Sequence, residues 1–180
     1  MNDISALSNW NTSKIKNMSQ AFRSCDSLTS LNALSDWDTS SLTNMYYTFA
    51  YCSTLSDISG LSNWNTLGVT TMSGLFFYCY RVYDINVLSS WDVRKVKDMS
   101  SLLSFSSIDD ITALKNWKTD SLTTMYNMFS YCADLIDATL LGYWNTSNVT
   151  TLTDTFTGCT KLADIHTFNM WDVHNAISLK

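Results

Sequence analysis

The 180-residue sequence contains no proline and only five glycines. Flexible or proline-rich linkers depend on those residues, so no hinge is indicated and we expect one domain over residues 1–180. No apolar run approaches the ~20 residues that a membrane span needs. Met1-Asn2-Asp3 leads at once into repeat sequence instead of a signal peptide.

Basic residues are also scarce, with 11 Lys and Arg against 16 acidic residues and a net charge of −5. This balance argues against nucleic acid as a partner, because phosphate contacts need clustered cations. The sequence has no CxxC motif and no Cys/His cluster. We therefore expect no metal and no other cofactor.

What the sequence does contain is an internal repeat marked by tryptophan. The seven tryptophans are spaced by 27, 27, 27, 26, 27 and 27 residues: Trp10, Trp37, Trp64, Trp91, Trp117, Trp144 and Trp171. Such regular placement is typical of a solenoid, in which equivalent positions stack into ladders. The repeats would be 10–36, 37–63, 64–90, 91–116, 117–143 and 144–170, flanked by partial repeats 1–9 and 171–180.

Each repeat carries apolar residues at helical spacing. In the second repeat these are Met45, Phe49, Cys52 and Leu55, with gaps of four, three and three. The spacing predicts a short helix over residues 45–53 and at its equivalents. Asn44 and its counterparts stand where they would cap the first turn of that helix. The counterparts are Asn17, Thr71, Asp98, Thr124 and Thr151.

The segment before each tryptophan changes period. Ile58 and Leu61 are apolar among small polar residues, which predicts a short strand pairing in parallel with its neighbours. After most tryptophans an Asn/Asp-Thr pair, such as Asn11-Thr12, predicts a turn held by side-chain to backbone hydrogen bonds. The predicted fold is an α/β solenoid, leucine-rich-repeat-like. Its six repeats would each hold a strand, a turn and a short helix, with a parallel sheet along one face.

The five cysteines occupy one repeat position, fifteen residues after a tryptophan: Cys25, Cys52, Cys79, Cys132 and Cys159. Stacking would bring neighbours within bridging range, but an odd number cannot pair completely. We expect a row of buried reduced thiols acting as small apolar residues. The sequence alone does not decide whether any of them pair.

These residues resemble the repeat of BspA-like leucine-rich repeat surface proteins. The likeness is carried by residues 28–31 (Leu-Thr-Ser-Leu), residues 35–45 (Ser-Asp-Trp-Asp-Thr-Ser-Ser-Leu-Thr-Asn-Met), Phe49 and Cys52. It covers almost the whole chain. Departures are Leu103 and Ser106 for Phe and Cys, and Val93 and Val173 for Thr. The resemblance implies a bacterial cell-surface or secreted protein, with adhesion to host or neighbouring-cell proteins in some members.

Two columns of residues are candidate binding surfaces. The first is acidic and would point outward from the predicted sheet, where it could dock a basic partner or cations: Asp57, Asp84, Asp110, Asp137 and Asp164. Alternatively these carboxylates are merely solvated or cap backbone turns. The second is an aromatic stripe that could bind protein or glycan: Tyr51, Tyr78, Phe105 and Tyr131. Its alternative role is stacking between repeats.

No catalytic residue is indicated, because the chain offers no activated nucleophile or metal set. The sequence predicts a non-catalytic protein-binding or adhesion module of a cell-surface or secreted protein, or alternatively a structural spacer without a specific ligand. It begins and stops in mid-repeat without visible polar caps. This suggests part of a longer protein, or ends that favour end-to-end self-association.

Overall fold

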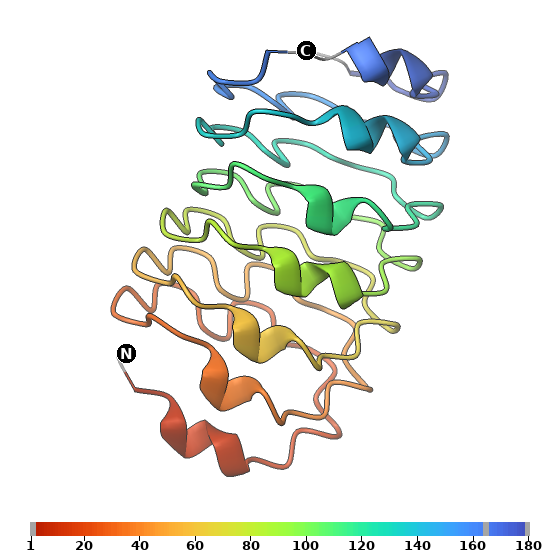
Figure 1. Cartoon of the computed structure of the whole chain (residues 1–180). Coiled ribbons are helices and arrows are strands. Elements are labelled where there is room, and N and C mark those ends of the chain that lie inside the picture. Colours follow the sequence, from red (N-terminus) through yellow and green to blue (C-terminus); the bar gives the residue numbers. More distant parts are fainter. Residues whose placement is uncertain (1–2, 164–165, 179–180) are drawn as a thin grey trace.

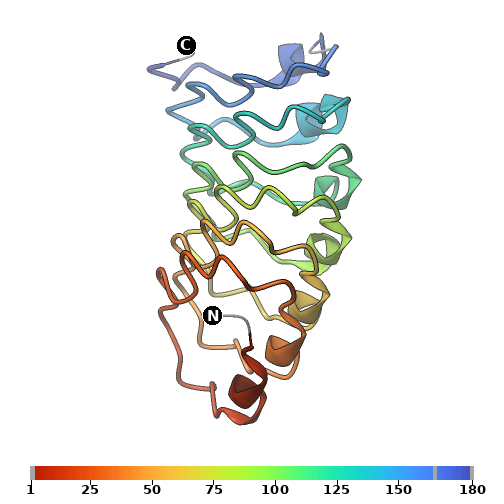
Figure 2. The same ribbon diagram turned by 90° about the vertical axis from the view of Figure 1, so that its left-hand side faces the viewer.

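The computed structural model describes residues 3–163 and 166–178. The chain rises in stacked turns, and a short 3-10 helix of each turn lies above that of the turn before it on one face (Figure 1). The two termini lie at opposite ends of the stack (Figures 1 and 2). The helices are η1 (Ser5–Asn9), η2 (Asn32–Leu34), η3 (Ser59–Leu61), η4 (Asn86–Ser90), η5 (Thr112–Leu114), η6 (Thr139–Tyr143) and η7 (His166–Met170).

The predicted α/β fold with a parallel sheet is wrong. Within the described ranges there is no α-helix and no β-strand, only the seven 3-10 helices and isolated parallel bridges. The bridges are Asn17↔Asn44, Ser30↔Asp57, Asn44↔Thr71, Thr71↔Asp98, Asp98↔Thr124, Thr124↔Thr151 and Thr151↔Ser178.

The segment predicted as a helix forms two consecutive four-residue turns, which we call the double turn. Thr48 N–H donates to Met45 O and Cys52 N–H to Phe49 O, each at 3.3 Å. The third residue of each turn has a positive φ, as in type II turns: 51° at Tyr47 and 62° at Tyr51. A right-handed helix cannot include such residues. The apolar residues begin successive turns, which reproduces helical spacing without a helix.

Neighbouring double turns are joined by a row of backbone hydrogen bonds. N–H groups of alternate residues reach the next turn, from Met45 to Thr71 O at 3.1 Å and from Tyr47 to Ser73 O at 2.8 Å. The row continues with Phe49 N–H to Leu75 O at 3.0 Å. The pattern resembles that of a parallel sheet, but the residues between the donors turn instead of extending, so no strand forms.

The strand predicted around Ile58 is likewise absent. Ile58 has φ −108° and ψ 12°, far from the extended region, and it leads directly into η3. Asp57 forms one isolated bridge, with Ser30. The turn predicted after most tryptophans is confirmed, since Asn11 Oδ1 accepts the Ser13 N–H at 3.3 Å and Asp38, Asn65 and Asn145 accept the equivalent N–H groups.

The predicted ladder of tryptophans is present and ties the turns together. The rings of Trp37 and Trp64 stack at 6.4 Å with 3° between their planes. Trp64 Nε1 donates to Leu34 O of the preceding turn at 3.1 Å, and every later tryptophan repeats this bond. Trp10, in the first turn, is 58% exposed.

The predicted core positions are buried, with Met45, Phe49, Cys52 and Leu55 at 0% exposure. Burying a side chain of this size contributes about 1.5–3 kcal/mol. None of the helices among the described residues is long and apolar enough to cross a bilayer.

Candidate functional site

The structure brings the four residues of the aromatic stripe into one stack. Ring centroids are 5.2 Å apart between Tyr51 and Tyr78, 4.1 Å between Tyr78 and Phe105, and 4.5 Å between Phe105 and Tyr131. All four lie in the double turns. The stacking expected under the structural alternative is therefore present, and it holds the rings in fixed positions.

Both ends of this stack are covered. The guanidinium of Arg23 lies 5.2 Å from the centre of the Tyr51 ring, within the range of a cation–π contact. At the other end, a Cβ added to Gly158 would come within 2.6 Å of the Tyr131 ring. The glycine thus leaves room for that ring. The ring faces are occupied by neighbours, while ring edges reach solvent, with Tyr131 50% exposed.

The stack stands on strained backbone. Its φ angles are 62° at Tyr51, 59° at Tyr78, 61° at Phe105 and 59° at Tyr131. A residue with a Cβ pays about 1–2 kcal/mol for a left-handed conformation, whereas glycine adopts it freely. Gly158 occupies the same slot one turn later, with φ 76°. Aromatic stacking contributes about 0.5–1.5 kcal/mol per pair and offsets part of this cost.

Further aromatic side chains extend the stack into a surface that we call the tyrosine face. It comprises the stripe, the half-buried Phe77, and Tyr46, Tyr80 and Tyr126, which are 40%, 48% and 42% exposed. Phe77 packs edge-on against both Tyr51 and Phe105. Sequence reasoning missed Phe77 and Arg23, and the only available signal was their place one residue before a stripe position.

The acidic column lies on another part of each turn, where each described aspartate stands two residues before the start of a 3-10 helix. Asp84 Oδ1 accepts the Asn86 N–H at 2.9 Å, and Asp137 Oδ1 accepts the Thr139 N–H at 2.7 Å. Asp110 does the same with Thr112 at 2.8 Å. These carboxylates therefore cap backbone turns, as one alternative reading of the sequence predicted. Asp164 lies outside the described residues.

Asp57 is the most engaged member of the column. One carboxylate oxygen accepts the N–H and hydroxyl of Ser59 at 3.0 and 2.6 Å. The other accepts Ser30 Oγ and Asn32 Nδ2, both at 2.9 Å. The hydrogen bond from the Ser59 hydroxyl is the largest cause that lowers the pKa of Asp57 below its usual 3.8. The Asp57 carboxylate therefore already accepts four hydrogen bonds from groups of this chain.

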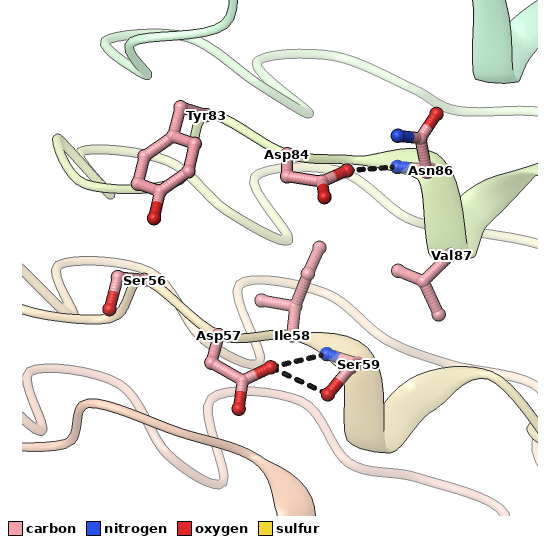
Figure 3. Close-up of a pocket in the computed structure, with 8 residues that line it drawn as sticks. All are labelled: Ser56, Asp57, Ile58, Ser59, Tyr83, Asp84, Asn86 and Val87. Carbon is pink, nitrogen blue, oxygen red and sulfur yellow. Dashed lines mark hydrogen bonds between the residues drawn. The ribbon is translucent and has the colours of Figure 1, made fainter.

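A shallow pocket of about 430 Å³ separates Asp57 from Asp84 (Figure 3). Its lining includes the apolar side chains of Ile58 and Val87 and the exposed Tyr83. Figure 3 shows the two carboxylates one above the other, each turned toward the start of its own 3-10 helix. The described aspartates thus lie in a column, but each carboxylate accepts a backbone hydrogen bond within its own turn.

All five thiols are free; three are buried in the core, while Cys25 and Cys159 are half-buried against it. Cys52 Sγ donates to Phe22 O of the preceding turn at 3.1 Å, and burial raises the pKa of Cys52 to about 12. Burial likewise raises the pKa of Cys132 to about 12. Thiols of this kind are protonated near neutral pH and are poor nucleophiles. Across residues 3–163 and 166–178, no three His, Cys or Asp side chains are grouped to hold a metal ion.

A family model described as "Mycoplasma protein of unknown function, DUF285" matches residues 1–109 and 103–180. The chain belongs to this family. Among solved structures, it is similar to a leucine-rich repeat protein from Bacteroides ovatus, at 17% identity and a TM-score of 0.45. That match covers 82% of this chain and 40% of the Bacteroides protein. No curated protein matches.

Proposed function

We propose that this DUF285-family chain is a non-catalytic protein-binding module of a cell-surface or secreted protein, with an adhesive role. Its contact surface would be the tyrosine face. The observation that carries the proposal is the row of aromatic residues at positive φ, because strain retained at bulky residues points to a use for those side chains.

The chemistry of the tyrosine face favours a protein partner. Tyrosines there are interspersed with Ser, Thr and Asn, including Ser100, Asn127 and Thr153. Rigid tyrosines among small polar residues form the binding surfaces of antibodies, because they supply contact area and hydrogen bonds at low entropic cost. A glycan would need open ring faces to stack upon, whereas the faces of the stripe are covered by one another, by Arg23 and by Gly158.

The stripe is also restricted to the middle of the stack. The equivalent positions are Ser24 in the first double turn and Gly158 in the last. A role in stacking alone would suit every turn equally. Decoration of four consecutive turns instead defines a patch of limited size, as a partner requires.

A binding measurement on intact cells tests the proposal. The labelled chain would be added to host epithelial cells and analysed by flow cytometry, with and without protease shaving and periodate oxidation of the cells. We expect staining that is lost after protease treatment and kept after periodate. Tyr78→Phe/Tyr131→Phe retains both rings, as Phe105 shows the stack allows, and should weaken binding about tenfold through the lost hydroxyl groups.

Tyr83→Phe/Tyr143→Phe removes two exposed hydroxyls elsewhere and is the matched control. It should bind as the unaltered chain does. If staining survives protease treatment, or if both double variants bind equally well, the tyrosine face is not a protein-binding surface. A chain that stains no cells leaves the spacer as the better account.

A further inference from the structure

Two residues that depart from the repeat lie at one junction between neighbouring turns. The second residue after the tryptophan is threonine in most repeats, but it is Val93 in the fourth. The residue directly after the tryptophan is Lys118 in the fifth repeat, whereas its six counterparts are Asn or Asp: Asn11, Asp38, Asn65, Asp92, Asn145 and Asp172. Val93 and Lys118 both line a pocket of about 220 Å³, which we call the junction pocket.

The valine removes a hydrogen-bonded tie between turns. At four other junctions a threonine hydroxyl makes this tie; Thr66 Oγ1, for example, donates to Asp92 O at 3.0 Å and accepts the Asp92 N–H at 2.8 Å. The same donation is made by Thr39, Thr119 and Thr146. Val93 is buried and has no hydroxyl, and no hydrogen bond among the described residues uses the backbone N–H or C=O of Lys118. One donor and one acceptor are therefore left for a ligand.

The lysine gives up a second hydrogen bond, the cap of its own turn. Its counterparts accept the N–H two residues further on through Oδ1, as Asp92 does from Arg94 at 3.0 Å. An ammonium group has no acceptor, so Lys118 cannot make this bond. Two interactions that stabilise other turns are thus missing at one place. In a chain that otherwise keeps to one pattern, such departures are expected at functional sites.

The junction pocket is also lined by unpartnered donor groups. Its lining includes Arg94 and Asn116, both exposed. The Asp92 carboxylate accepts from Arg94 Nε at 3.1 Å and from Nη2 at 2.5 Å, which orients the guanidinium and leaves Nη1 without a partner in the described chain. The Lys118 ammonium and the Asn116 amide have no partner there either. Because the charges of Arg94 and Asp92 offset each other, Lys118 gives the pocket a net positive charge.

We propose that the junction pocket binds an acidic residue in an exposed peptide segment of a protein partner. The carboxylate of that residue would lie against the Lys118 ammonium and Arg94 Nη1, as charge-assisted hydrogen bonds require. Its backbone would pair with the unused N–H and C=O of Lys118. The volume is below the ~300–1,000 Å³ of pockets for drug-sized ligands, so it suits a single residue. The site lies outside the double turns and does not depend on the tyrosine face.

A peptide matches these groups better than an inorganic anion does. Sulfate would satisfy the cations, but it has no donor for the Lys118 carbonyl. A peptide residue can exchange both backbone hydrogen bonds with one facing residue, as paired residues of antiparallel strands do. An acidic residue therefore supplies a carboxylate, an N–H and a C=O together. A uronic acid offers a carboxylate beside hydroxyl groups, which makes it the competitor that an experiment must exclude.

Proton–nitrogen correlation NMR spectra of the labelled full chain test the proposal during titration with acetyl-Gly-Asp-Gly-amide. We expect the backbone N–H signal of Lys118 to shift with a dissociation constant in the millimolar range. The uncharged peptide acetyl-Gly-Asn-Gly-amide should bind about tenfold more weakly. No shift at Lys118 with about 20 mM peptide, or equal affinity for the two peptides, overturns the proposal. Tighter binding of glucuronate or sulfate at the same N–H group also overturns it, in favour of a glycan or an ion.

Two substitutions that restore the repeat sharpen the test. Lys118→Asn removes the cation and should weaken binding of the Asp peptide about tenfold. Val93→Thr keeps every charge but returns the bridging hydroxyl to the Lys118 backbone, so it should also weaken binding. The same hydrogen bond should raise the melting temperature by about 2–4 °C. Both variants should fold, because other turns carry Asn and Thr at these positions.

Lys97→Thr is the matched control, since it removes a nearby charge outside the pocket and restores the threonine found at positions 70 and 123. It should bind the Asp peptide as the unaltered chain does. Unchanged affinity of Lys118→Asn, or an equal loss for Lys97→Thr, would indicate unspecific charge attraction and overturn the proposal. Unchanged affinity of Val93→Thr would overturn the pairing with the Lys118 backbone.

Discussion

The tyrosine face and the 3-10 face hold adjacent turns together by different groups. On the first, backbone N–H groups of alternate residues reach the next turn, as Tyr47 N–H does to Ser73 O. On the second, the face lined by the 3-10 helices, helical N–H groups bond within their own turn, as Leu61 N–H does to Ile58 O, and the tie between turns that recurs at every tryptophan from Trp37 onward is the indole Nε1. Surface side chains can therefore vary on the tyrosine face, whereas on the 3-10 face a tie between turns that recurs along the stack is made by a side chain, that of tryptophan.

The largest expected effect is that of Trp64→Ala. Removing a large buried ring costs about 3–5 kcal/mol in unfolding free energy, and the Leu34 carbonyl would also lose its donor. Trp64→Phe keeps much of the ring but not the N–H, so it should cost about 1–3 kcal/mol. Urea unfolding followed by circular dichroism measures both.

The matched control on the tyrosine face is Tyr51→Phe, which leaves every backbone hydrogen bond between turns in place. It should change stability by less than about 0.5 kcal/mol. If Trp64→Phe lowers the free energy of unfolding no more than Tyr51→Phe does, the two faces do not differ in the way described.

A second, smaller effect concerns the strained backbone of the tyrosine face. Tyr78→Ala loses ring stacking and keeps the positive φ, so it should destabilise by about 1–3 kcal/mol. Tyr78→Gly loses the same stacking but adopts this φ freely. Glycine should therefore be more stable than alanine here, by about 1 kcal/mol.

On the 3-10 face the order should reverse. At Val87 in η4, alanine should be more stable than glycine, because the backbone there is helical. Thermal unfolding of the four variants gives both orders. Alanine ahead of glycine at position 78 would mean that the tyrosines are not strained.

The difference between the faces also explains what the sequence could predict. Buried positions such as Met45 and Phe49 were predictable, because apolar side chains recur at each of them. The helix was not, since turns beginning at Met45, Phe49 and Cys52 produce the same gaps of four, three and three. A positive φ is usually signalled by glycine, but in the second repeat Tyr47 and Tyr51 occupy those positions, and among the described residues glycine does so only at Gly74 and Gly158.

The same distinction applies to the candidate surfaces: residues that recur at one repeat position could be predicted, whereas residues that occur once could not. The aromatic stripe was predictable from repeat position alone, because one residue per turn must stack once the turns do. Its end covers, Arg23 and Gly158, were not, since each differs in residue type from its counterparts in the other turns. For the acidic column, capping and docking were both consistent with an aspartate two residues before a helix. The hydrogen bonds of Asp57 and Asp84 favour capping.

The smallest expected effect is a pH dependence that arises at Asp57. Its hydrogen bonds, first of all that of the Ser59 hydroxyl, lower the pKa of the folded carboxyl below 3.8. A carboxyl with a depressed folded pKa stabilises the protein above its unfolded pKa, and this contribution is lost as pH falls through the folded value. Asp57→Asn should therefore lower the melting temperature at pH 7, and the difference from the unaltered chain should vanish near pH 2. Asp84→Asn is the control, with a smaller difference at pH 7, because Asp84 accepts only the Asn86 N–H among the hydrogen bonds found in the described chain. A difference for Asp57→Asn that persists unchanged at pH 2 would show that the Asp57 charge does not stabilise the start of η3.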